Sequence, residues 1–178
     1  MSPRALLRSA LPFIHALIAV SIFFLLISSW WMMALPLPSK VFTYRAIPFQ
    51  LHKNVGLTVV VLVVVLLYAR LRYLLTAGKS RSRLRGLSLV QHVLLYALVL
   101  VCCVSGYLSS AYSGWATRVW WLFNLPNWGG DNDALNDFYA DIHTWSTYAL
   151  LAVTVVHVGN AVYHAFRNDG VVRRMIRL

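Results

Sequence analysis

The sequence predicts an all-α membrane protein, a bundle of four transmembrane helices that forms one domain over residues 1–178. Three observations predict this class. Of the 178 residues, 60% are hydrophobic and only 12% are charged, a balance typical of membrane proteins. The chain contains four apolar runs that are each long enough to cross a hydrocarbon core of about 30 Å. Most of its Lys and Arg residues are confined to the N-terminus, one loop and the C-terminus.

The distribution of basic residues predicts how the bundle is oriented. Twelve of the sixteen Lys and Arg lie in the three segments just named. Because basic loops are retained in the cytoplasm, both termini and the loop between the second and third spans are expected there. The net charge of +11 is therefore a topological signal, and nucleic-acid binding is not expected. The only cysteines, Cys102 and Cys103, are adjacent within an apolar run, which favours packing over a disulfide or a zinc site.

The first two spans are predicted at about residues 10–33 and 48–71. The first carries His15 near its cytoplasmic start, and the second carries His52 near its outer end. Gly56 follows one turn after His52 on the same side of the helix. The absence of a side chain there would let a flat ligand approach the backbone, although packing against another helix is an equally ordinary use of Gly in membranes.

The third span is predicted at about residues 87–111, with His92 near its cytoplasmic end. The segment 112–137 that follows is rich in Trp, with Trp120 and Trp121 adjacent. Trp at this density favours a short helix that lies in the outer membrane interface between the third and fourth spans.

The fourth span, about residues 138–166, contains His143, His157 and His164. Over the 14 positions from His143 to His157 the side-chain direction rotates to about 40° short of whole turns. Both imidazoles therefore project from nearly the same side of the helix. Along the axis they are about 21 Å apart, close to the two edges of the hydrocarbon core. This spacing suits two stacked redox centres, one in each leaflet.

Four antiparallel spans place each histidine at a definite depth. His52 and His143 lie toward the outside, and the remaining four lie toward the cytoplasm. Polar groups at such depths are costly and usually face the bundle interior, where they have partners. Two iron centres with bis-imidazole ligation would use four of them. The outer centre would pair His52 with His143, and the inner centre would pair His157 with one of the other inner histidines, His15 or His92.

Two such pairs would clamp porphyrins inside the bundle. No Cys-x-x-Cys-His motif occurs, so the hemes are expected to be b-type rather than covalently attached. Two other interpretations remain open from spacing alone. One is a structural network of histidines, and the other is a transporter of protons or metal ions.

The whole chain resembles the bacterial cytochrome b561 family, in particular its small four-helix members. The resemblance rests on His15, on LHKNVGL in the second span, on GLSLVQHVLLYAL at the start of the third, and on DIHTWSTYALLAVTVVHVGNAVYH in the fourth, followed by NDGVVRRM. It covers roughly residues 8–176 and implies a multi-pass protein of the bacterial inner membrane that binds two b hemes.

The resemblance also implies a role for each histidine. His15 and His157 become the axial ligands of the inner heme iron, and His52 and His143 those of the outer one. His92 matches a family histidine that does not ligate iron, so it is expected to support the inner heme or to be structural. His164 matches a position at an inner quinone pocket, with a surface imidazole as the alternative.

The implied function is the transfer of single electrons across the membrane between a periplasmic donor and the quinone pool. Some family members are superoxide oxidases, so one version is a superoxide:ubiquinone oxidoreductase. The alternative is a non-catalytic membrane anchor that receives electrons from a periplasmic redox protein. Membrane lipid and a quinone such as ubiquinone are the other expected partners.

Overall fold

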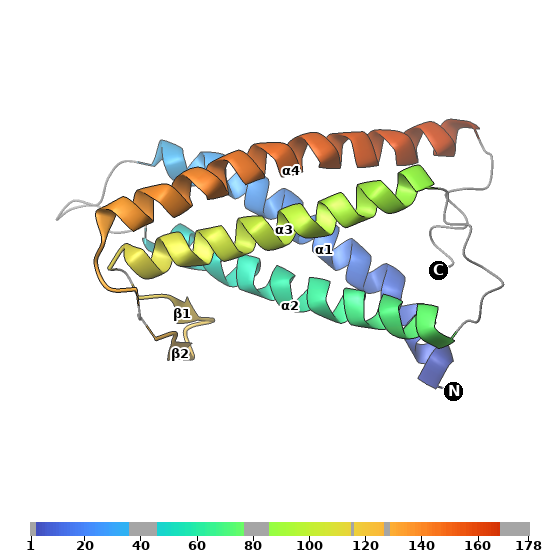
Figure 1. Ribbon diagram of the computed structural model, residues 1–178, viewed down its shortest axis with the longest axis horizontal. Coiled ribbons are helices and arrows are strands. Elements are labelled where there is room, and N and C mark those ends of the chain that lie inside the picture. Colours follow the sequence, from blue (N-terminus) through green and yellow to red (C-terminus); the bar gives the residue numbers. More distant parts are fainter. Residues whose placement is uncertain (1–2, 36–45, 77–85, 115, 127–128, 168–178) are drawn as a thin grey trace.

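The structure is a computed structural model that describes residues 3–35, 46–76, 86–114, 116–126 and 129–167. It contains four long helices that run alternately up and down (Figure 1). They are α1 (Pro3–Ala34), α2 (Ala46–Thr76), α3 (Gly86–Tyr112) and α4 (Asp133–Arg167). The start of α1, the end of α2, the start of α3 and the end of α4 lie at one end of the molecule. That end is called the inner end below, and the opposite one the outer end.

The described part of the chain confirms the prediction of four membrane-spanning helices. Each helix contains an apolar stretch long enough to cross a bilayer. The four predicted spans lie within these helices, which extend beyond them at both ends. Along these stretches the share of residues buried inside the protein is only 11% to 28%, which is expected where lipid covers the outward faces.

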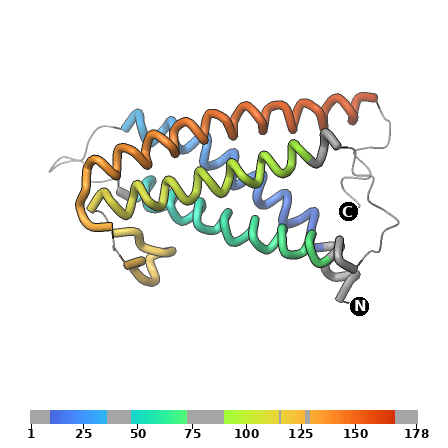
Figure 2. Tube along the Cα trace, in the orientation of Figure 1, coloured from blue at the N-terminus to red at the C-terminus, as the bar shows by residue number. Residues whose placement is uncertain are grey.

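The four helices form two close pairs. The α1 backbone packs against α2, and the α3 backbone packs against α4, whereas α4 makes little close backbone contact with α1 or α2. Figure 2 shows the same arrangement as a trace. On the side of α4 that faces α1 and α2, the space between the backbones is therefore available to side chains or to a bound ligand.

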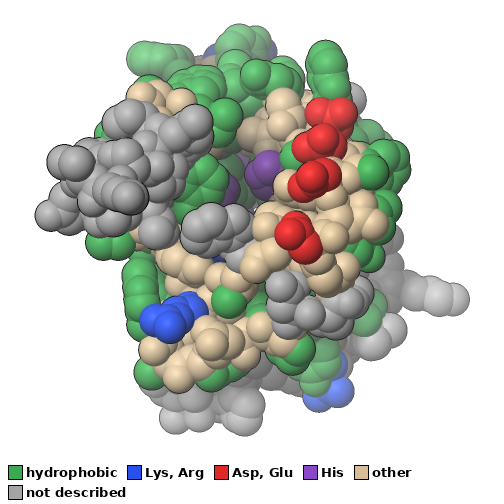
Figure 3. Space-filling model, turned by 90° about the vertical axis from the view of Figure 1, so that its left-hand side faces the viewer, with side chains coloured by type: hydrophobic (Ala, Val, Ile, Leu, Met, Phe, Trp, Pro, Cys, Tyr) green, Lys and Arg blue, Asp and Glu red, His purple; other side chains and the backbone are tan. Residues whose placement is uncertain are grey.

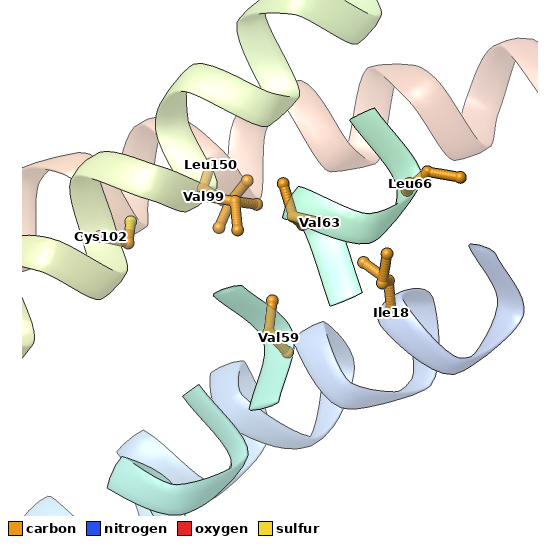
Figure 4. Packing of buried hydrophobic residues seen from close by; sticks show 7 residues of the cluster. All are labelled: Ile18, Val59, Val63, Leu66, Val99, Cys102 and Leu150. Carbon is orange, nitrogen blue, oxygen red and sulfur yellow. The ribbon is translucent and has the colours of Figure 1, made fainter. Parts of the chain in front are cut away.

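A small apolar core joins all four helices at mid-height (Figure 4). It contains Ile18 of α1, Leu150 of α4, and five residues of α2 and α3, which are Val59, Val63, Leu66, Val99 and Cys102. Leu150 lies seven residues from both His143 and His157. The core therefore separates two levels of the bundle, each with its own histidines.

The expected interfacial helix is not found in residues 116–126, which form a hairpin instead. Strand β1 (Arg118–Val119) pairs antiparallel with β2 (Phe123–Asn124). The turn is closed by a hydrogen bond from Leu122 N to the Val119 carbonyl, and its central residues, Trp120 and Trp121, have φ of 44° and 62°. Positive φ at both central positions is the backbone of tight hairpin turns, which Gly and Asn usually provide.

Contacts with α2 explain why the chain adopts this turn. Asn54 Oδ1 accepts a hydrogen bond from Trp120 N at 2.8 Å, and Thr58 Oγ1 lies 3.2 Å from the donor Trp120 Nε1. Gln50 Nε2 donates to the Ala116 carbonyl at 2.8 Å. Gln50, Asn54 and Thr58 recur every four residues and so share one side of α2. This polar stripe satisfies backbone groups that a helix would otherwise have bonded internally.

The beginning of α4 is fixed by local hydrogen bonds. Asn132 Oδ1 accepts from Leu135 N at 3.1 Å, as a helix N-cap does, and Asp133 in the first turn suits the positive end of the helix dipole. Ser109 Oγ donates to Asn136 Oδ1 at 2.8 Å and so ties α4 to the end of α3. This tie helps to set the register of α4, and with it the height of its histidines.

Candidate functional site

Four histidines meet in two pairs, one at each end of the bundle. The ring centroids of His52 and His143 are 6.3 Å apart at the outer end, and those of His15 and His157 are also 6.3 Å apart at the inner end. In each pair one ring comes from α4 and the other from the α1–α2 pair. The rings thus face one another across the side of α4 that has little backbone contact.

This separation suits two ligands of a single iron. An imidazole nitrogen binds a first-row metal at about 2 Å and lies about 1 Å from its ring centroid, so two axial imidazoles have centroids about 6 Å apart. Direct stacking of two rings would allow a closer approach. Both pairs therefore fit the axial ligation of heme, in which the porphyrin supplies the remaining four nitrogens.

Hydrogen bonds orient the two outer imidazoles. His143 Nδ1 lies 2.8 Å from the Cys102 carbonyl oxygen, to which only an Nδ1–H can donate. His52 Nδ1 lies 3.4 Å from Ser28 Oγ, which itself donates to the Leu25 carbonyl. A histidine that donates from Nδ1 keeps Nε2 unprotonated and able to bind a metal. The carbonyl contact therefore gives His143 the tautomer that iron ligation through Nε2 requires, and the Ser28 contact is compatible with the same tautomer of His52.

Gly106 of α3 makes room for His143. A Cβ atom at this position would lie 2.9 Å from His143 Nδ1 and 3.0 Å from Cε1, which is too close for a real contact. The sequence gives only a weak signal for Gly106, a Gly in the outer third of a membrane span, because Gly there is common for ordinary helix packing.

Cys102 joins α3 to α4 beside the same histidine. Its thiol donates to Ser146 Oγ at 3.2 Å, and Ser146 Oγ in turn donates to the His143 carbonyl at 3.1 Å. Thr147 Oγ1 donates to that carbonyl at 2.7 Å. Cys102 is buried and is not in a disulfide, as expected. Beyond packing, it holds His143 through both its carbonyl and its thiol.

The inner end brings together three histidines. The His92 ring lies 5.2 Å from the His157 ring, edge to face, on the opposite helix of the α3–α4 pair. That separation is shorter than the value for two ligands of one iron. The His15–His157 separation equals that of the outer pair, which favours His15 as the partner of His157 and a supporting role for His92.

The other two predicted site residues are Gly56 and His164. A Cβ at Gly56 would meet nothing within 4 Å, so the backbone of α2 faces open space there. His164 lies two turns beyond His157 on α4 and is half-buried, with its ring 5.5 Å from that of Tyr163. Its part in a quinone site stays a prediction.

Several buried polar atoms near the two levels lack a protein partner within the described residues. They are Asn54 Nδ2, Tyr96 Oη and Thr154 Oγ1. Tyr96 lies one turn from His92 on α3, and Thr154 lies one turn from His157 on α4. Buried polar groups are normally hydrogen-bonded, so unpaired ones beside a candidate site are consistent with a bound group that the chain alone does not supply.

Histidine side chains are visible within an opening at the outer end (Figure 3). Acidic side chains form a row along one side of this opening. Asp133, Asp137 and Asp141 are exposed and recur every four residues at the start of α4, and exposed Asp131 precedes them. No group of three or more His, Cys, Asp or Glu within the described ranges could hold a bare metal ion.

Comparison with known proteins gives the family. Residues 7–178 match the model of the family described as prokaryotic cytochrome b561. One curated relative, cytochrome b561 homolog 2 of Escherichia coli (strain K12), is 31% identical over 86 residues, which are 48% of this chain and 46% of the relative. The chain thus matches about half the length of that relative. No solved structure matches. The chain belongs to the prokaryotic cytochrome b561 family of membrane electron-transfer proteins, which binds heme b.

Proposed function

We propose that this chain is a diheme b-type cytochrome that moves single electrons across the membrane between an outer donor and the quinone pool. The observation that carries the proposal is the equal 6.3 Å separation of two histidine pairs at the two ends of the bundle. Each pair has the spacing of two axial ligands, and each lies where α4 stays apart from α1 and α2.

Each histidine pair would hold one heme b. His52 and His143 would bind the outer iron, and His15 and His157 the inner one. Heme b supplies reversible one-electron chemistry when bound. The bond from His143 to the Cys102 carbonyl keeps that imidazole in the tautomer that binds iron, and Ser28 would orient His52. The open space at Gly56 would let the flat ring system approach α2.

The chain sets the distance between the two sites. His143 and His157 are on one uninterrupted helix, and the apolar core around Leu150 lies between them. This apolar layer lies between the two levels and disfavours charged groups there, because charge is costly in an apolar medium. The inner end, with half-buried His164, is where the quinone would bind.

Two observations at the outer end favour different donors. Lys53 is half-buried next to His52, and Arg118 is exposed on the hairpin, so cationic groups are available to attract superoxide. The topology predicted from the sequence also puts Lys40 and Arg45 on this side, but both lie outside the described residues. The exposed Asp133, Asp137 and Asp141 instead suit a basic periplasmic redox protein, for which this chain would be the membrane anchor.

Heme content with histidine variants tests the proposal. The purified protein should give a b-type reduced-minus-oxidised spectrum with two hemes per chain. His143→Ala should remove the outer heme and His15→Ala the inner one, each leaving about half of the heme absorbance because each iron loses one of its two protein ligands. A colourless protein purified from cells with ample iron would overturn the proposal and leave the structural network of histidines or the transporter.

His92→Ala is the matched control for the inner pair, since it removes an imidazole at the same depth. It should retain both hemes. If it lost a whole heme while His15→Ala lost none, the inner pairing would be wrong although the diheme proposal would stand.

The donor is tested separately in vesicles with ubiquinone. A superoxide source should reduce the hemes faster than it does in a heat-denatured control if the protein is a superoxide oxidase. Reduction no faster than the control would leave the anchor role, in which electrons enter from a protein partner.

A further inference from the structure

Five side chains from all four helices lie close together at the inner end. The His15 ring contacts His157 at 6.3 Å, and the His157 ring contacts His92 at 5.2 Å. The His92 ring then lies 6.5 Å from the Tyr96 ring, and the guanidinium carbon of Arg70 lies 5.8 Å from the Tyr96 ring centre.

Arg70 is a half-buried cation near the inner end of the membrane span of α2, which runs from Ile47 to Arg72. A charged group that stays partly buried there needs water or a group of opposite charge as a partner. The five acidic residues of the chain are Asp131, Asp133, Asp137, Asp141 and Asp169. The first four are at the outer end of the bundle, and Asp169 lies outside the described residues. Within the described ranges, therefore, no carboxylate lies near Arg70.

Tyr96 provides a second and independent indication. Its hydroxyl is buried and has no hydrogen-bond partner among the described residues, and the guanidinium carbon of Arg70 lies 5.8 Å from the centre of the same ring. A guanidinium and an unpaired hydroxyl donor are two groups that bind a carboxylate. Because the hydroxyl is buried, its partner must enter the bundle and cannot remain at the lipid surface.

We propose that Arg70 and Tyr96 form a carboxylate site that holds a propionate of the inner heme. The inference rests on the proposed function, since it requires a heme ligated by His15 and His157. The site would neutralise one propionate within the membrane and would fix the rotation of the heme about its iron-ligand axis. The sequence alone indicates no ligand-binding role for either residue, and it counts Arg70 only among the basic residues that predict orientation.

The test is a redox titration of purified protein that contains both hemes. Arg70→Gln removes a positive charge near the inner heme, so the oxidised form becomes relatively more stable and the inner midpoint potential falls. We expect a shift of at least tenfold in the equilibrium constant, about 59 mV for one electron. Tyr96→Phe should give a smaller fall, and Arg70→Lys should restore most of the potential. The inner heme is identified by repeating the titration in His143→Ala.

Arg72→Gln is the matched control, because Arg72 is an exposed cation two residues away on the same helix. It should leave both potentials unchanged. If Arg70→Gln shifted the inner potential no more than Arg72→Gln, the inference would be wrong while the diheme assignment remained intact. If Arg70→Gln failed to take up the inner heme, Tyr96→Phe would decide the question, since an unchanged potential in that variant would contradict the site.

A lipid phosphate is the other anion available near the inner surface. Heme-depleted wild type and Arg70→Gln are reconstituted with protoheme or with its dimethyl ester, which has no propionate charge. A propionate site predicts that esterification weakens binding to the inner site in the wild type at least tenfold more than in Arg70→Gln. An equal effect in both proteins would mean that Arg70 binds lipid phosphate, and would overturn the proposal.

Discussion

At the scale of single residues, the outer site depends on a position in α3 that has no side chain. Gly106 allows the His143 ring to lie against α3, where its Nδ1 can donate to the Cys102 carbonyl. The same two residues thus determine both the position and the tautomer of His143. Such supporting groups usually affect metal binding nearly as much as the ligands themselves.

Gly106→Ala is expected to weaken the outer heme site selectively. The new methyl group would lie 2.9 Å from His143 Nδ1, so the ring must shift and its bond to the Cys102 carbonyl must lengthen. Overpacking of this kind costs about 1–3 kcal/mol, which corresponds to about 5- to 150-fold in outer heme affinity. Heme titration of the apoprotein measures the effect.

Gly159→Ala is the control for this prediction. Gly159 is also in a membrane helix, and a Cβ there would meet nothing within 4 Å. Both variants gain the same helix propensity, so they differ only in the contact with His143. Equal heme affinity in the two variants would show that His143 does not need the space at Gly106.

The sequence predicts the pairing of the histidines more accurately than it predicts the groups that surround them. His143 and His157 are fixed by helical periodicity and depth, and their partners follow from antiparallel spans. The choice between His15 and His92 was open from spacing alone. The supporting groups, Gly106 and Ser28, act through contacts between helices, which depend on helix rotation and cannot be calculated from a single span.

At the scale of elements, the four helices could be predicted because membrane spans have an unmistakable length and composition. The segment that follows α3 could not. Trp120 and Trp121 adopt a left-handed backbone that their residue type does not favour, and the compensating bonds come from Asn54 and Thr58, more than sixty residues earlier. Local sequence therefore favoured a helix where long-range hydrogen bonds produce a hairpin.

Asn54→Ala is expected to release the hairpin from α2. Trp120 N would lose its acceptor, and the loss of one part-buried hydrogen bond costs about 0.5–1.5 kcal/mol, or about 2- to 13-fold faster local opening. Amide hydrogen exchange of the peptide covering residues 116–126 measures this. The free energy of global unfolding should change less, because the variant also removes Asn54 Nδ2, a buried donor that has no hydrogen-bond partner among the described residues.

Asn124→Ala is the matched control, since Asn124 is exposed on β2 and pairs with Arg118 through its backbone. Its exchange should equal that of the wild type. Exchange in Asn54→Ala that matched this control would mean that the hairpin holds its turn without α2.

At the scale of the whole molecule, charge separates the two ends. Exposed acids gather at the outer end, and the described basic residues Arg70, Arg72 and Arg167 lie near the inner ends of α2 and α4. The orientation predicts that Asp133→Cys, at the start of α4, reacts with an impermeant maleimide applied to spheroplasts. Arg167→Cys, at the other end of α4, should react only after permeabilisation, because the reagent must first reach the cytoplasm.

The wild-type chain is the background control for labelling, since Cys102 is buried and Cys103 is half-buried within α3. Labelling of Arg167→Cys in intact spheroplasts, with Asp133→Cys protected, would show that the orientation in the membrane is the reverse of the one proposed. The proposed sites for donor and quinone would then exchange sides.

A single uninterrupted helix, α4, contributes one imidazole to each pair. The insertion or deletion of one residue between His143 and His157 would rotate one imidazole by about 100° relative to the other and turn it away from its partner. Loops can change in length without such a penalty. Over evolution this stretch of α4 can therefore accept substitutions but not changes in length, and its residue count should be the most constant dimension of the molecule.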